Sequence, residues 1–272
     1  MYHQEFPPPE ALRDAIKCFW YNRRDVGAQQ SSFEVMPDGY AEIIFHFGGD
    51  CGIFRDGAWH SLPSPFMMGL LDQPVLLCAT NRLEIIAIRC YPWTVFDLLG
   101  LPSGKEGAHI FTHPIARLHA ALDRQVKAGR IDEAIAEVSR AFPHARAGLA
   151  PDSTLFKAGA AMRKANGTMP VADVAAAAHA TVRTLERKFK QSSGRTVKDV
   201  SALMRFEQVR NRLWHRPQSS IADLAGELGY TDQSHLSREF KRYSGTTPAA
   251  FARQAKERRQ AVGGDFVAFI QA

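Results

Sequence analysis

Short apolar segments separated by turn residues run through the first third of the chain. The turns contain Pro37-Asp38-Gly39, Gly48-Gly49-Asp50 and Pro63-Ser64-Pro65. The segments between them have the length and composition of β-strands, and they span residues 15–21, 33–35, 41–47, 66–70, 75–79 and 83–91. Short strands at near-regular spacing predict a β-sandwich or a small barrel.

Segment 41–47 alternates between two faces that both carry apolar side chains. Phe45 falls on one face, and Glu42 and His46 fall on the other, because successive side chains of a strand point to opposite sides. Neither face is wholly polar. We therefore expect both faces to be covered, with one of them lining a cavity.

The period of the apolar positions changes after Pro92. A short helix is expected at 93–100, and two amphipathic helices are expected at 114–128 and 131–142. Residues 143–152 are rich in Pro, Ala and Gly, and they predict a connection between two domains. The predicted division is a first domain over 1–145, a linker over 146–152, a second domain over 153–255 and an extension over 256–272.

A pair of short helices around a glycine lies within residues 220–253. Ser220 is a suitable N-cap, apolar positions follow at helical spacing, and Gly229 suits the positive φ of a tight turn. The second helix of the pair has Leu236 and Phe240 on its inner face. Two short helices joined by a tight turn predict a helix-turn-helix.

Residues 171–191 repeat this pattern. The turn of this first pair contains His179, and the helix after it is expected to face inward with Val182, Leu185 and Phe189. A residue other than glycine takes the left-handed conformation at a cost of roughly 1 kcal/mol. His179 is therefore expected to lower the stability of this unit, while residues 171–191 keep their assignment as a helix-turn-helix.

A helix expected at 197–215 separates the two pairs. Its apolar face is so wide that we expect it to be buried between two bodies. Its 19 residues span about 28 Å, and the major groove on one side of B-DNA repeats at about 34 Å. A rigid spacer of this length can hold two recognition helices in adjacent major-groove segments on one face of DNA.

Charge is divided unevenly along the chain. Residues 1–150 contain 14 Lys and Arg against 17 Asp and Glu, a net charge of −3, whereas residues 151–272 contain 20 against 11, a net charge of +9. An acidic half and a basic half indicate two domains with different partners. The basic half, together with its helix-turn-helix pattern, favours a polyanionic partner.

The cysteines lie in the first half of the chain without any Cys-x-x-Cys spacing, at Cys18, Cys51, Cys78 and Cys90. This pattern favours free buried thiols in a reducing compartment over disulfides or a zinc site. The sequence shows neither a signal-peptide pattern nor an apolar stretch of about 18 residues. We therefore expect a cytoplasmic protein with no membrane partner.

Many features of one family occur together in the second helix pair, at Ile221, Ala222, Ala225, Gly229, Tyr230, Gln233, Ser234, Ser237, Arg238, Phe240, Lys241, Gly245 and Pro248. This stretch resembles the second helix-turn-helix of the AraC/XylS family of bacterial transcription regulators. Arg205, Phe206, Arg210 and Leu213 match the linker-helix pattern of that family. The strands and helices of the first half resemble its cupin-like sensor or dimerisation domain. Family members usually carry Gly where His179 stands.

The resemblance implies an α+β protein. Its N-terminal domain would be a cupin-like β-sandwich or barrel with helices, and its C-terminal domain would be all-α, with two helix-turn-helix units joined by a linker helix. The implied function is a DNA-binding transcription regulator, most often an activator, which is not an enzyme and needs no cofactor. The implied partners are double-stranded DNA, a second copy of the chain, a small-molecule effector and, for an activator, RNA polymerase. The alternative is a DNA-binding protein whose first half only dimerises.

The candidate DNA contacts are the side chains expected to be exposed on the two recognition helices: Arg183, Thr184, Glu186, Arg187 and Lys190 on the first, and Gln233, Ser234, His235, Ser237 and Arg238 on the second. By resemblance, the base-reading positions of the first helix fall on Arg183, Glu186 and Arg187. Arginine suits the O6 and N7 atoms of guanine. Glu186 either accepts a hydrogen bond from a cytosine amine or pairs with neighbouring Arg or Lys and only orients them. Arg205 and Arg212 are expected to contact phosphate or solvent.

A candidate effector pocket combines polar anchors with an apolar lining. The anchors are Glu42, His46 and Arg89, and the lining consists of Trp20, Phe45 and Tyr91. The alternative is that the polar groups satisfy one another in or near the core.

Two kinds of enzyme are disfavoured. A metal-dependent cupin enzyme would need a His-x-His pair, but His46 stands alone. His109 and His113 are four residues apart, but Pro114 follows at once, so we expect solvated or capping histidines and no metal. A repair enzyme that shares this DNA-binding module would need an activated cysteine beside a histidine, and no cysteine of the chain has one adjacent in sequence.

Overall fold

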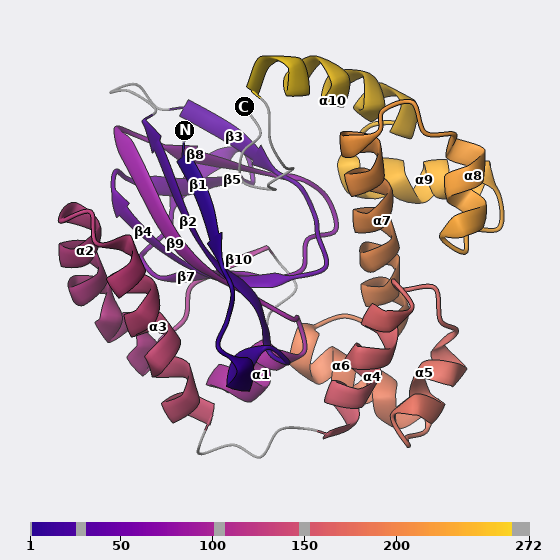
Figure 1. Cartoon of the computed structure of the whole chain (residues 1–272), viewed down its shortest axis with the longest axis horizontal. Coiled ribbons are helices and arrows are strands. Elements are labelled where there is room, and N and C mark those ends of the chain that lie inside the picture. Colours follow the sequence, from indigo (N-terminus) through magenta and orange to yellow (C-terminus); the bar gives the residue numbers. More distant parts are fainter. Residues whose placement is uncertain (1, 26–30, 101–106, 147–152, 263–272) are drawn as a thin grey trace.

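A computed structural model describes residues 2–25, 31–100, 107–146 and 153–262. The first half forms two antiparallel sheets (Figure 1). The six-stranded sheet has the order β1-β2-β9-β4-β7-β10, and the four-stranded sheet has the order β3-β8-β5-β6. The strands are β1 (Tyr2–Phe6), β2 (Ile16–Asp25), β3 (Ser31–Val35), β4 (Ala41–Gly48), β5 (Cys51–Arg55), β6 (Ala58–Ser61), β7 (Phe66–Met68), β8 (Val75–Ala79), β9 (Arg82–Cys90) and β10 (Ala108–His109).

Both faces of β4 are buried, as the sequence predicts. Phe45 packs into a core between the six-stranded sheet and the helices that cover it. These helices are α1 (Thr94–Leu99), α2 (His119–Lys127) and α3 (Ile131–Arg146), with 3₁₀ turns at Glu10–Leu12 and Pro114–Leu118. Ile44 points the other way, into a second core between the two sheets. The interior between the sheets is filled by side chains such as Trp20 and Phe66.

Several details of the first half differ from the prediction. α3 continues through residues that were assigned to the connection, up to Arg146. The helix expected at 114–128 is divided into a 3₁₀ turn and α2. Strand β6 escaped prediction because all four of its residues are exposed and it therefore has no apolar face. The rest of the predicted linker, 147–152, and the last residues of the tail, 263–272, lie outside the described residues.

The second half consists of helices: α4 (Ser153–Lys164), α5 (Val171–Ala177), α6 (Val182–Ser193), α7 (Val197–His215), α8 (Ile221–Glu227), α9 (Gln233–Ser244) and α10 (Pro248–Val262). α5 with α6, and α8 with α9, form the two predicted helix-turn-helix units. His179 has φ 51° and Gly229 has φ 69°, so both turns use the left-handed conformation expected of them. The α+β architecture predicted from the sequence is confirmed.

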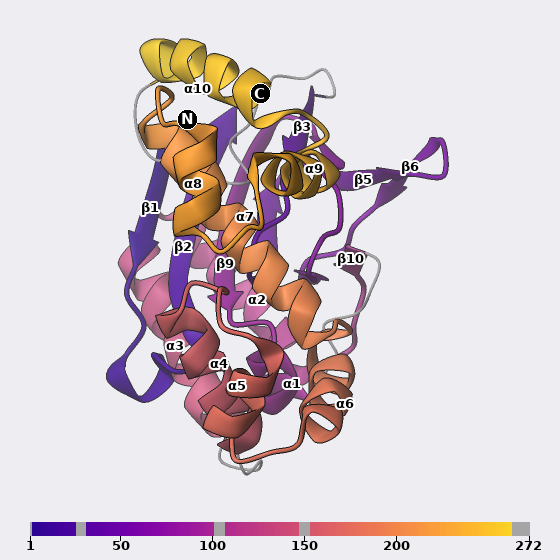
Figure 2. The same ribbon diagram turned by 90° about the vertical axis from the view of Figure 1, so that its right-hand side faces the viewer.

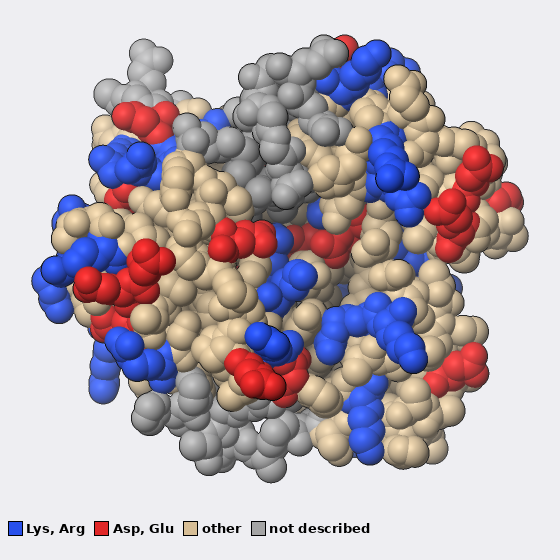
Figure 3. All heavy atoms as spheres, in the orientation of Figure 1, with Lys and Arg blue, Asp and Glu red and all other residues tan. Residues whose placement is uncertain are grey.

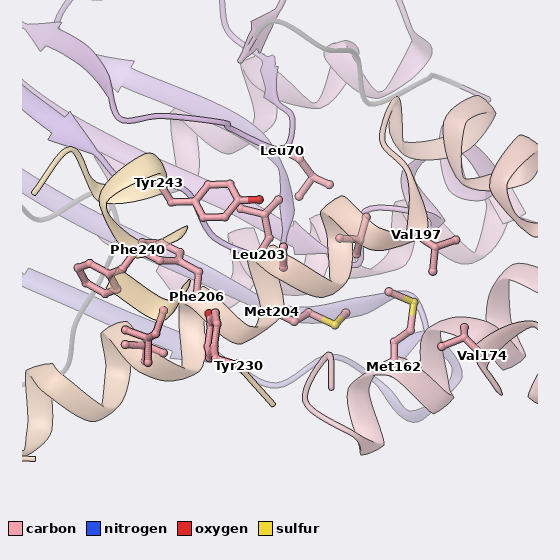
Figure 4. Close-up of a cluster of buried hydrophobic side chains, with 14 of the residues drawn as sticks. Leu70, Met162, Val174, Val197, Leu203, Met204, Phe206, Tyr230, Phe240 and Tyr243 are labelled. Atoms are coloured by element: carbon pink, nitrogen blue, oxygen red, sulfur yellow. The ribbon is translucent and has the colours of Figure 1, made fainter. Parts of the chain in front are cut away.

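The two halves share a hydrophobic core. Leu70 and Trp93 of the first half belong to the same buried cluster as Leu203 of α7 and Phe189 of α6. Figure 4 shows Leu70 reaching toward Leu203 from the sheet side. The Trp93 ring packs against α4 at Gly159, where a side chain would collide with it. Within the described residues, no helix is both long and apolar enough to cross a membrane.

Candidate nucleic-acid interface

Helix α6 of the first unit presents basic side chains to solvent. Thr181 caps its N-terminus by accepting a 3.2 Å hydrogen bond from the Thr184 amide. Leu185 and Phe189 are fully buried and fix the rotation of the helix. That rotation leaves Arg183, Arg187 and Lys190 exposed. In Figure 3, Lys and Arg side chains also gather over the region of α4, which lies in front of α6 in this view.

Val182 is not on the inner face, contrary to the sequence prediction. It is 43% exposed, whereas Leu185 and Phe189 are 0% exposed. Val182 shares a stripe with Phe189, seven residues away, but it lies in the first turn of α6, where the core no longer covers the helix.

Glu186 is turned toward the start of α7, and Thr184 is half-buried beside the N-cap of its own helix. The Glu186 carboxylate accepts a 3.2 Å hydrogen bond from the backbone N–H of Val197, the first residue of α7. The carboxylate therefore binds a backbone N–H that has no partner within its own helix. Neither of the two roles considered from the sequence, contact with cytosine or pairing with Arg or Lys, included this one. The Thr184 hydroxyl lies 3.0 Å from the Thr181 hydroxyl, beside the N-cap.

Helix α9 of the second unit is built in the same way. Asp232 caps it through a 2.7 Å hydrogen bond from the His235 amide. Leu236 and Phe240 are buried, while Gln233, Ser234 and Arg238 are exposed. The His235 ring packs edge-on against Tyr230 at 5.3 Å between centroids, and Ser237 is half-buried. Of the five predicted contacts on α9, the exposed ones are therefore Gln233, Ser234 and Arg238.

The linker helix α7 holds the two recognition helices on the same side (Figure 2). Its bounds coincide with the prediction, and its N-terminus is closed by a capping box between Thr196 and Asp199. Arg205 does not face solvent or DNA as expected. It donates 3.0 Å to the Gly167 carbonyl oxygen and lies 3.2 Å from Glu239 of α9, so it braces one unit against the other.

A loop of the sheet half also contacts both units. The Asp72 carboxylate pairs with Arg195, in the turn between α6 and α7. Its other oxygen lies 3.9 Å from the Arg242 guanidinium of α9. Arg195 in addition donates a 2.9 Å hydrogen bond to the Leu70 carbonyl oxygen.

Three of the predicted effector residues form a buried polar cluster. Arg89 donates to Glu42 at 2.7 Å and to Asp38 at 2.8 Å, and Trp20 donates to the same Glu42 oxygen at 3.2 Å. These groups satisfy one another, as the alternative interpretation held. Burial raises the pKa of Glu42 to about 7 even though Arg89 lowers it. The second Glu42 oxygen, Oε2, has no hydrogen-bond partner among the described residues.

The other three predicted effector residues lie elsewhere, so the six do not line one pocket. Phe45 faces the helices on the opposite side of the sheet, because it is an odd number of positions from Glu42. His46 lies further along β4, where its Nε2 atom contacts the Leu62 carbonyl oxygen at 3.0 Å, and burial lowers its pKa. Tyr91 faces the helical half, beneath the Arg163 guanidinium at 4.0 Å.

Tyr91 instead lines a small cleft between the two halves. The cleft has a volume of about 160 Å³ and is lined by Lys17, Gly39, Tyr40, Tyr91, Arg163, Asn166, Met204, Glu207 and Gln208. The Nη1 atom of Arg163 is buried and has no hydrogen-bond partner among the described residues. No local sequence pattern indicates this cleft, because its residues come from both halves of the chain.

The remaining candidate groups have structural roles. His113 caps a 3₁₀ turn, since its Nδ1 atom accepts a 3.1 Å hydrogen bond from the Ile115 amide. All four cysteines are free and buried. Burial raises the pKa of the Cys18 and Cys51 thiols to about 12, which keeps them unreactive.

Comparison with protein families assigns the second half. Residues 174–254 match a family model described as a helix-turn-helix domain. The chain carries an AraC-type helix-turn-helix domain. Residues 4–106 match a domain of unknown function (DUF6597). The AraC-type domain places the chain among DNA-binding transcription regulators rather than enzymes.

Solved structures similar to the chain include ToxT from Vibrio cholerae O395, with 13% identity and a TM-score of 0.48 over 87% of this chain and 98% of that chain. The DNA-binding domain of AdpA in complex with a target DNA has 25% identity and a TM-score of 0.37 over 40% of this chain and 98% of that chain. A transcriptional regulator with an AraC-type domain from Chromobacterium violaceum has 23% identity and a TM-score of 0.35 over 38% and 91%. No curated protein matches the chain.

Proposed function

We propose that this chain is a sequence-specific transcription regulator that binds DNA through both of its helix-turn-helix units. The observation that carries the proposal is the placement of α6 and α9 on the same side of α7, with Arg183, Arg187 and Arg238 exposed (Figure 2). Arginines at such positions suit guanine edges, and the surrounding Lys and Arg supply the phosphate contacts that give affinity.

Selection of bound DNA from a random pool tests this proposal. We expect an asymmetric site of roughly two helical turns, since the two units differ in sequence. Arg187→Ala and Arg238→Ala should each weaken binding to the selected site by about 1–3 kcal/mol and relax base preference at separate positions. Arg124→Ala on α2 is the matched control, because it removes the same charge from the exposed face of the sheet half. A pool that yields no enriched sequence would contradict sequence-specific binding.

We further propose that a small-molecule effector binds in the cleft between the halves. Lys17 and the unpartnered Arg163 nitrogen supply positive charge, and Tyr40 and Tyr91 supply aromatic surface. Glu207 also lines the cleft, but its carboxylate lies 3.8 Å from the Arg210 guanidinium, so a small carboxylate that pairs with Arg163 suits the cleft best. A thermal-shift screen of the full chain against small carboxylic acids tests this idea. An acid that stabilises the wild type but not Arg163→Gln would support it, and an equal response of both proteins would contradict it.

The remaining parts of the proposal concern assembly and output. We propose that the chain forms a homodimer in the cytoplasm and activates transcription by contacting RNA polymerase. In each chain, residues 1–145 would form the effector-binding and dimerisation domain, and residues 153–255 would form the DNA-binding domain. A reporter placed downstream of the selected site tests the direction of regulation. Repression of the reporter would reject the activator role while leaving DNA binding intact. Sedimentation with and without the site tests the dimer.

A further inference from the structure

An apolar side chain lies on the outward surface of the first recognition helix. Among the described residues of α6 and α9, Val182 is the large hydrophobic side chain that is markedly exposed. It is β-branched and therefore has few rotamers, so it cannot easily fold back onto the helix. Its neighbour Arg183 is exposed as well, so the first turn of α6 presents an apolar and a basic side chain to solvent.

The two units are equivalent residue by residue, which fixes the position of Val182. Thr181 and Asp232 are the N-caps of the two recognition helices, and Val182 and Gln233 are the residues that follow them. Leu185 is equivalent to the buried Leu236, with the same spacing from the cap. Val182 therefore occupies the place where the other unit exposes an amide suited to adenine.

We propose that Val182 determines specificity by packing against the C5 methyl group of a thymine in the major groove. Thymine is the base that presents an apolar group there, and small apolar side chains at the N-terminus of a recognition helix are suited to it. In this contact, the Val182 side chain, which is exposed to water in the free protein, would become buried against the thymine methyl group. This inference rests on the proposed DNA-binding function and names one base contact of that same surface.

Replacing thymine by deoxyuridine tests the contact directly, because the exchange removes only the methyl group. In the selected site, each thymine is replaced in turn and the dissociation constant is measured. We expect one replacement in the half-site of the first unit to weaken wild-type binding about fourfold, the value expected for one buried methyl group. In Val182→Ala the same replacement should have no effect. Val182→Ile, which keeps the branched side chain, should retain the sensitivity.

The outcomes separate this inference from the proposed function. Specific binding that tolerates deoxyuridine at every thymine would overturn the role of Val182 and leave the function standing. A sensitive thymine that stays equally sensitive in Val182→Ala would also overturn it. Failure to obtain any selected site would overturn both. Because Val182 is exposed, the variants should keep the wild-type melting temperature. Equal melting temperatures would show that differences in DNA affinity come from the contact and not from a loss of folding.

Discussion

The Arg210 guanidinium of α7 donates a 2.7 Å hydrogen bond to the backbone carbonyl oxygen of Pro37, across the boundary between the two halves. The Arg210 side chain is only 4% exposed, it also donates a 3.3 Å hydrogen bond to Asn211 Oδ1, and the Glu207 carboxylate lies 3.8 Å from its guanidinium. Burial raises the pKa of Glu207, although Arg210 opposes this shift. The linker helix that holds the two recognition helices is thus tied to the sheet half by a buried cation.

Arg210→Ala should destabilise the protein by about 3–5 kcal/mol, because it leaves Glu207 buried without its cation. Urea unfolding measures the loss. Arg212→Ala is the control, since its pair with Glu227 is 44% and 54% exposed on the two sides, and exposed pairs contribute at most about 1 kcal/mol. Equal losses in the two variants would contradict the buried role of Arg210.

The free energy of unfolding should depend on pH through Glu42. Its pKa is about 7 in the folded chain, raised by burial from an ordinary value of 4.5. Between these values the unfolded chain releases a proton that the folded chain retains, so stability is greatest at low pH within this window and is lost as pH rises toward 7. The loss should be smaller in Glu42→Gln, which has no proton to release. Urea unfolding from pH 5 to 8 gives the free energy of unfolding of the wild type and of Glu42→Gln. Identical slopes of this free energy against pH would show that the pKa of Glu42 is not raised in the folded chain.

Gly159 and Gly226 should respond in opposite ways to alanine. A Cβ atom at Gly159 would lie 2.1 Å from the Trp93 ring, whereas one at Gly226 would meet nothing within 4 Å. Gly226→Ala should therefore stabilise the chain by about 0.5–1 kcal/mol through helix propensity alone. Gly159→Ala should destabilise it, because overpacking typically costs about 1–3 kcal/mol. Thermal unfolding checks both, and a stabilised Gly159→Ala protein would mean that Trp93 can move without cost.

Lys190 should contact phosphate rather than bases. It is exposed on α6, and its ammonium is a point charge without the planar fork that suits guanine. Lys190→Ala should lower the slope of log K against log salt by about 1 and leave the preferred sequence unchanged. Titrations at several salt concentrations measure the slope. A shift of base preference without a change of slope would reverse the assignment.

The sequence predicted those parts of the fold that depend on local pattern. The bounds of α7, the two helix-turn-helix units and the two buried faces of β4 all follow from spacing of apolar positions along the chain. The exposure of Val182 did not follow, because periodicity shows the stripe on which a residue lies but not where the partner helix ends. The contacts of Glu186 and Arg205 depend on which backbone groups lie nearby in space. The six predicted effector residues do not line one pocket: the contacts of His46 and Tyr91 also depend on spatial neighbours, whereas the strand alternation already puts Phe45 opposite Glu42.

Asp72 illustrates what such contacts mean for control of the molecule. One carboxylate from the sheet half meets Arg195 beside the first recognition helix and Arg242 on the second. A displacement of the loop that contains Asp72 would disturb the ion pairs beside α6 and on α9 at the same time. Any signal that moves the sheet half would therefore change the binding of both recognition helices to DNA in one step, rather than weakening the binding of each helix independently.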